Sequence, residues 1–303
     1  MAPARVLALA LWALLVACGR DGVSSTGIDA AGSVDATTDS PADVSSDVRT
    51  EGAPDALADV PEAGDGGPAQ AIAIPMYIDP GASPTDWSQE TAAASTVALL
   101  VANPNSGPGS SAQPQYAQAI ATAHAASQSI VGYVHTSYGA RAIAQVEADV
   151  DAWYSFYQSI DGIFYDEVSS DATTIPGYYK PIFDYVKAKP AGPRTVVINP
   201  GTIVGEAFMQ AADVVVTFED TYAHYTDGSY PPNPSWMAGY PRWRFWHLVL
   251  SATTASDMQN AVVIARGRNV GYVYVTDQPP ATAYSQLVRG SYWQAELSAV
   301  RAP

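Results

Sequence analysis

Short apolar runs alternate with stretches of helical length from residue 71 to the end of the chain. The runs are nearly continuous and rich in β-branched residues, as strands covered on both faces are. We expect strands over 71–78, 96–103, 129–136, 162–167, 194–199, 214–219, 244–250 and 271–276. Helices should occupy 83–94, 113–128, 140–158, 178–189, 205–212, 255–266 and 282–300.

Eight strands, each followed by a helix or a connection of helical length, predict the α/β class and a single (β/α)8 TIM barrel over residues 71–303. An open doubly wound sheet shows the same alternation of strand and helix. The count of eight and a length close to that of a typical barrel favour closure. The least regular connection, residues 220–243, is too long for a simple loop and lies where binding loops are found.

The first seventeen residues have the plan of a signal peptide. Arg5 precedes an apolar run that is shorter than the roughly 20 residues of a membrane span. The run ends on Leu15-Val16-Ala17-Cys18, which resembles a bacterial lipobox, so we expect lipid attachment at Cys18. Gly19 favours the outer membrane or cell surface as the envelope location. Because Cys18 is the only cysteine, an intramolecular disulfide and a cysteine metal cluster are excluded.

Residues 18–70 are predicted to be a disordered acidic linker behind the lipidated cysteine. The linker holds eleven Asp or Glu against two Arg and no aromatic residue. Such a composition cannot bury enough apolar surface to fold, and its charges repel one another. The domain over 71–303 is also acidic, which argues against nucleic acid and is compatible with a neutral or cationic ligand. We expect this domain to be a monomer.

Acidic, amide and aromatic residues follow the predicted strands at their carboxyl ends, where barrels place their active sites. The strand over 162–167 ends on Asp166 and Glu167, and the strand over 214–219 ends on Glu219. Acids of this kind also cap helices, which is the alternative reading of Asp166 and Glu167. We expect substrate contacts from polar and aromatic side chains close to these strand ends: Tyr77, Asn105, Tyr133, His135, Tyr138, Asn199, Tyr222 and His247.

Other classes of site leave no trace in the sequence. His135 and His247 lack the spacing of a metal site, so we expect no metal and no cofactor. The sequence also has no P-loop, no dinucleotide fingerprint and no nucleophile elbow. The loop over 103–109 is rich in Asn, Pro, Ser and Gly, so it is either a rigid turn or a source of hydrogen bonds for a ligand.

Two carboxylates on different strands suit glycoside hydrolysis, in which one acid protonates the leaving oxygen and the other attacks the sugar or activates water. Asp166 and Glu219 fit these roles as nucleophile and general acid/base. Adjacent strand residues point to opposite faces, so Glu167 can join them only by turning at the strand end. The alternative is a carbohydrate-binding surface protein that keeps the barrel without the catalysis.

The sequence resembles the spherulin-4 family, glycoside hydrolase family 135, which is related to the endo-α-1,4-polygalactosaminidases. The resemblance rests on segments in the same order as in the family: Ile74-Pro75-Met76-Tyr77, residues 101–109 and 132–141, Asp161-Gly162-Ile163-Phe164-Tyr165-Asp166-Glu167, Asn199-Pro200-Gly201 and Phe218-Glu219. It implies a (β/α)8 barrel and endo-hydrolysis of α-1,4-linked N-acetylgalactosamine polymers such as galactosaminogalactan. The essential acids of the family fall on Asp166, Glu167 and Glu219.

Overall fold

The computed structural model describes residues 70–190 and 192–303. The predicted signal peptide over 1–17, the lipidated Cys18 and the linker up to residue 69 lie outside the described residues. The described part begins at Gln70, which is fully buried directly before the first strand and whose side-chain amide donates to the Val270 carbonyl oxygen.

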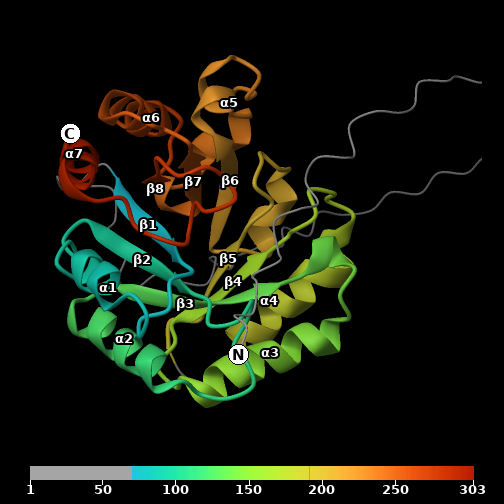
Figure 1. Ribbon diagram of the computed structural model, residues 1–303. Helices are drawn as coiled ribbons and strands as arrows, with labels where there is room; N and C mark the ends of the chain where they lie inside the picture. The colour runs from blue at the N-terminus through green and yellow to red at the C-terminus, as the bar shows by residue number, and fades with distance from the viewer. Residues whose placement is uncertain (1–69, 191) are drawn as a thin grey trace, which may run out of the picture. The chain divides into compact units, whose positions relative to one another are not determined.

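Eight parallel strands form a closed barrel in sequence order (Figure 1), which confirms the predicted fold. β1 closes the barrel against β8 through the pairs Ala71 with Tyr272 and Ile72 with Val273. The strands are β1 (Ala71–Met76), β2 (Val97–Ala102), β3 (Ser129–His135), β4 (Gly162–Asp166), β5 (Thr195–Ile198), β6 (Val214–Thr221), β7 (Phe245–Leu250) and β8 (Tyr272–Val275).

Helices surround the barrel on its outer side (Figure 1). The α-helices are α1 (Pro84–Thr91), α2 (Pro114–Ala125), α3 (Ile143–Phe156), α4 (Lys180–Lys187), α5 (Tyr222–Thr226), α6 (Ala255–Gly267) and α7 (Gly290–Arg301). Between β5 and β6 the predicted helix over 205–212 is only a 3-10 turn, Glu206–Gln210. Pro84 and Pro114 stand in the first turns of α1 and α2, where a missing N–H leaves no helical hydrogen bond unmade.

The alternation of side chains along β4 decides which residues face the barrel interior. The Tyr165 hydroxyl donates to the Ile182 carbonyl oxygen of α4, so Tyr165 faces outward. Phe164 and Asp166, its neighbours on either side, therefore face the interior. On β3, Gly132 faces outward beneath the indole of Trp153, and a Cβ at this position would collide with that ring. Tyr133 and His135 consequently share the inner side with Asp166.

The prediction for the last helix is wrong in its first part. α7 begins at Gly290 rather than at 282, and residues 276–289 form an irregular connection after β8. Gly290 has φ +61°, a left-handed conformation that does not continue a helix. Leu287 and Val288 are buried in the connection, and burial of apolar side chains outweighs the helix propensity of the stretch. The connection carries Tyr284 onto the carboxyl end of the barrel.

Candidate active site

Asp166, Asn199 and Glu219 stand at the carboxyl ends of the consecutive strands β4, β5 and β6. The side-chain nitrogen of Asn199 donates to Asp166 Oδ1 at 2.9 Å and to Glu219 Oε2 at 2.5 Å. Two oxygens bonded to one nitrogen at these distances lie no more than about 5.4 Å apart. Strand order thus brings together two carboxylates that are 53 positions apart in the chain.

Three tyrosines complete the surroundings of the two carboxylates. The Tyr133 hydroxyl donates to Asp166 Oδ2 at 2.8 Å, and the Tyr284 hydroxyl donates to Glu219 Oε1 at 2.7 Å. Tyr77, at the end of β1, packs edge-on between the other two rings with centroid distances of 5.4 Å to each. All four carboxylate oxygens therefore have a donor, and an aromatic wall connects the two acids.

The surroundings raise the pKa of both acids. Burial raises the pKa of Glu219 to about 7, and the negative charge of Asp166 adds to the rise. Hydrogen bonds from Asn199 and Tyr284 oppose it. Burial also raises the pKa of Asp166, while the bonds donated by Tyr133 and Asn199 act to lower it. The pKa of Glu219 thus lies near neutral pH, in the range in which a carboxyl can donate a proton.

Glu167 directly follows β4 in a left-handed conformation, with φ +52°. A non-glycine residue is uncommon in this conformation and persists only where surrounding contacts hold its backbone. Its carbonyl oxygen accepts from the Tyr138 backbone N–H at 2.6 Å and from the Thr136 hydroxyl at 2.7 Å. This left-handed turn ends the alternation of side chains along β4 after Asp166. The negative charge of Glu167 lies close enough to Asp166 to raise the pKa of Asp166.

A family model described as spherulation-specific family 4 matches residues 71–300. This chain belongs to the spherulin-4 family. Spherulin-4 of Physarum polycephalum is 35% identical over 242 residues, which are 76% of this chain and 70% of that protein. The resemblance found in the sequence is therefore confirmed.

Two solved structures place this spherulin-4 family member among known barrels. The crystal structure of Aspergillus clavatus Sph3 in complex with GalNAc matches with a TM-score of 0.66 and 25% identity, covering 78% of this chain and 99% of that chain. A chitinase from Chromobacterium violaceum matches with a TM-score of 0.50 and 11% identity, covering 77% and 100%. At that identity the chitinase shows a shared fold alone.

The predicted substrate-contact residues fall into two groups, those close to the two acids and those without a bond to them. Tyr77, Tyr133 and Asn199 contact the acids or each other, as described above. His135 lies beside Asp166 in the β3–β4 register, and its Nδ1 is buried without a hydrogen-bond partner. Tyr138 is 55% exposed on the turn that holds Glu167.

The remaining three predicted residues make no hydrogen bond to either acid in the described part of the chain. Asn105 is exposed on the loop after β2. The Tyr222 hydroxyl accepts from the side-chain amide of Asn260 on α6, at the outer side of the barrel. His247 is fully buried, and both ring nitrogens are hydrogen-bonded to tyrosines, so the predicted substrate contact does not fit its position.

Tyr284 is the site residue that the sequence did not reveal. The sequence pattern placed it inside the last helix, and nothing in its neighbours distinguishes it from the other tyrosines of the domain. Only the irregular connection after β8 brings its hydroxyl to Glu219. Within residues 70–190 and 192–303, no three His, Cys, Asp or Glu side chains group as a metal site requires. Among the described helices, none has the length and hydropathy needed to cross a membrane.

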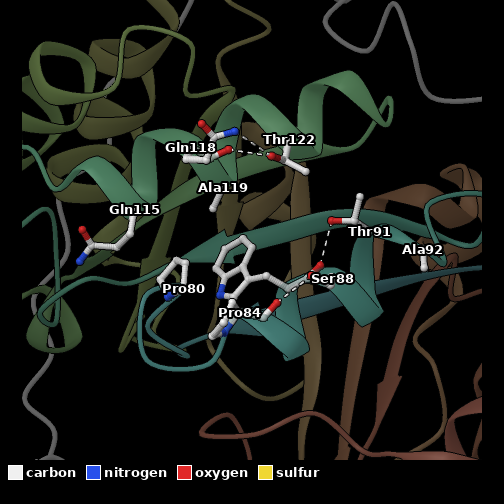
Figure 2. Close-up of a pocket in the computed structure, with 10 residues that line it drawn as sticks. Pro80, Pro84, Ser88, Thr91, Ala92, Gln115, Gln118, Ala119 and Thr122 are labelled. Carbon is white, nitrogen blue, oxygen red and sulfur yellow. Dashed lines mark hydrogen bonds between the residues drawn. The ribbon is translucent and has the colours of Figure 1, made fainter.

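A hollow of about 440 Å³ lies away from the acids, on the outer side between α1 and α2 (Figure 2). Pro84 and Trp87 of α1 and Ala119 and Thr122 of α2 are among the residues that line it. Its hydroxyls are used within the helices, as in the Thr122 hydroxyl bond to the Gln118 carbonyl oxygen. None of the described residues that line this hollow is charged, so the hollow offers no chemistry comparable to that of the paired carboxylates.

Proposed function

We propose that this protein is an endo-acting glycoside hydrolase that cleaves α-1,4-linked polysaccharides containing N-acetylgalactosamine or galactosamine. The observation that carries the proposal is the single amide nitrogen of Asn199 bonded to both Asp166 and Glu219. The resulting upper limit of about 5.4 Å between two oxygens lies below the roughly 6.5 to 9.5 Å of inverting glycosidases, which favours a retaining enzyme, whose acids are about 5 to 5.5 Å apart. The likeness to Sph3, crystallised in complex with GalNAc, supports the choice of sugar.

In this proposal Glu219 is the general acid and base, and Asp166 is the nucleophile. Glu219 gives its proton to the glycosidic oxygen as the bond between that oxygen and the anomeric carbon breaks. An Asp166 oxygen bonds to the anomeric carbon and forms a covalent glycosyl-enzyme. Glu219, now ionised, takes a proton from water, whose oxygen attacks the anomeric carbon and releases Asp166. Glu219 ends the cycle protonated, so proton and bond counts balance.

The neighbouring residues suit the two roles. Tyr133 and Asn199 donate to Asp166, and donors to a carboxylate favour its charged form. Burial favours the neutral form of Glu219. The tyrosines Tyr77 and Tyr284 give rings with an apolar body and a polar edge, which suits the faces of a sugar. The additional negative charge of Glu167 favours a neutral or cationic sugar over an anionic one.

The test is hydrolysis of α-1,4-linked N-acetylgalactosamine oligosaccharides by the parent protein and by Asp166→Asn and Glu219→Gln. Each substitution keeps the shape of the side chain and removes its charge or proton, so turnover should fall by a factor of about 10² or more. The exposed acids Asp171 and Glu206 provide matched controls, and Asp171→Asn and Glu206→Gln should retain the parent rate.

Four results separate the possibilities. A substrate with a good leaving group should restore the rate of Glu219→Gln but not that of Asp166→Asn, because only the first variant lacks the proton donor. Proton NMR of the first-formed product should show the anomeric configuration of the substrate. Near-parent rates in both variants would exclude the pair as catalytic acids. Binding of the oligosaccharide by the parent without cleavage would favour the carbohydrate-binding alternative.

We also propose that the domain is held at the bacterial envelope by lipid on Cys18. The support is the signal-peptide plan and the lipobox-like Leu15-Val16-Ala17-Cys18. Metabolic labelling with a fatty acid should mark the full chain but not a Cys18→Ser variant, and the variant should move from the membrane fraction to the soluble fraction. Equal labelling of the two proteins would refute the anchor.

A further inference from the structure

β6 contains an irregularity just before the catalytic glutamate. Val216 pairs with Trp246 of β7, but the next pair along the ladder joins Phe218 with His247. Thr217 is therefore an extra residue on β6, which is the two-against-one arrangement of a β-bulge.

The bulge decides the direction of the Glu219 side chain. Val216 and its ladder partner Trp246 face the barrel interior, where the Trp246 ring contacts Phe164 at 5.8 Å. Side chains of a regular strand alternate, so the third residue after Val216 would face outward, and Glu219 is that residue. The extra Thr217 shifts the alternation by one position and returns Glu219 to the inside.

A chain of hydrogen bonds ends on the carbonyl group of this bulge. The Tyr230 hydroxyl donates to the Thr217 carbonyl oxygen at 3.1 Å, which uses the only proton of that hydroxyl. His247 Nε2, 3.2 Å away, must therefore donate to the Tyr230 oxygen. His247 Nδ1 is then the acceptor for the Tyr225 hydroxyl at 2.6 Å. The geometry assigns a neutral imidazole with its proton on Nε2.

The chain is enclosed by the long connection between β6 and β7. His247, Tyr225 and Tyr230 are at most 5% exposed. The Phe218 ring, next to the bulge, packs on Tyr225 and Tyr230 with centroid distances of 4.5 and 4.7 Å. The Arg268 guanidinium lies 4.1 Å from the centre of the Tyr230 ring. On the outer side of β6, the hydrogen bond to the Thr217 carbonyl oxygen thus holds the backbone, and the packed rings hold the side chain of Phe218.

We propose that His247 and Tyr230 are positioning residues, which hold the Thr217 bulge and thereby turn Glu219 toward Asn199 and Asp166. Neither residue touches the reacting atoms, because both lie on the outer side of the barrel wall, whereas Glu219 faces the interior. The kinetic consequence rests on the proposed glycosidase function, whereas the placement of Glu219 does not. Burial and the Arg268 charge lower the pKa of His247 to about 3, so the imidazole stays neutral and the chain keeps its direction at neutral pH.

The experiment compares Tyr230→Phe with Tyr225→Phe. Both substitutions remove one buried hydroxyl bonded to the same imidazole and keep the ring that packs on Phe218. Only Tyr230→Phe removes the bond to the Thr217 carbonyl oxygen. The readouts are the Glu219 carboxyl titration, followed by NMR with carbon-13-labelled glutamate and assigned by its loss in Glu219→Gln, and the separate values of kcat and KM.

In Tyr230→Phe, the Glu219 pKa should fall from about 7 toward its ordinary value as the carboxyl leaves its buried position. Its kcat should fall by about 10- to 100-fold with little change in KM, the scale for a misplaced catalytic group. Tyr225→Phe should lose stability but keep the parent titration and kcat. An unchanged titration and kcat in Tyr230→Phe would overturn the proposal.

A second pair of variants covers a failure of Tyr230→Phe to fold. His247→Gln supplies an amide N–H that can replace Nε2–H toward Tyr230, whereas His247→Leu supplies none. The glutamine variant should retain the parent titration of Glu219 and the leucine variant should not, and equal titrations would overturn the proposal. If the parent hydrolyses no oligosaccharide, the proposed function fails, while the titrations still decide whether the bulge places Glu219.

Discussion

Removing the Glu219 charge should stabilise the protein at alkaline pH, although it abolishes the proposed acid catalysis. The pKa of this carboxyl is about 7 in the folded protein and 4.5 as the ordinary value. Because the folded value is raised, folding favours the neutral form. The stabilising contribution is complete below about pH 4.5 and is lost as pH rises through about 7.

The magnitude follows from the difference between the two pKa values. Each unit corresponds to about 1.4 kcal/mol, so ionised Glu219 costs roughly 3 kcal/mol of folding free energy at pH 8. At pH 5 most of the folded carboxyl is still protonated, and the cost is about 1 kcal/mol. The free energy of unfolding of Glu219→Gln relative to the parent should therefore rise by roughly 2 to 3 kcal/mol between pH 5 and pH 8.

The assay is urea unfolding of both proteins at the two pH values, followed by tryptophan fluorescence. Effects of the substitution that do not depend on pH, such as altered packing or hydrogen bonding, cancel in the comparison. Glu206→Gln removes an exposed glutamate and should show no such rise. If the difference between Glu219→Gln and the parent changes by less than about 0.5 kcal/mol between the pH values, the argument from burial is refuted.

Two further predictions concern one residue of the site and one packing position at the start of β4. In Tyr284→Phe the loss of the hydroxyl bond that lowers the Glu219 pKa should move the alkaline limb of the kcat/KM profile to higher pH, and a move to lower pH would contradict this. In Gly162→Ala a Cβ would collide with the Thr195 backbone, so thermal unfolding should show a loss of several kcal/mol. Gly205, with open space around its Cβ position, is the matched control, and a similar loss in Gly205→Ala would contradict the steric argument.

The strand order of the barrel and the pair of acids were readable in the sequence. The near-continuous apolar runs are required by strands covered on both faces, and their spacing leaves room for one crossover each. Asp166 and Glu219 each follow such a run, so parallel strands had to bring them to the same rim. The closed barrel and the hydrogen bonds from Tyr133 and Asn199 to this pair agree with that reasoning.

The direction of each side chain at the rim was decided only in three dimensions. Period-two alternation predicts faces only while a strand stays regular, and Thr217 and Glu167 break it through a bulge and a left-handed turn. His247 illustrates the other limit, since its sequence position fits both a pocket residue and a buried support. Tyr284 reaches Glu219 from a connection 65 positions away. The local sequence pattern predicts helices and strands through propensity and periodicity. Bulges, irregular connections and raised pKa values arise instead from packing between segments that are distant in the sequence.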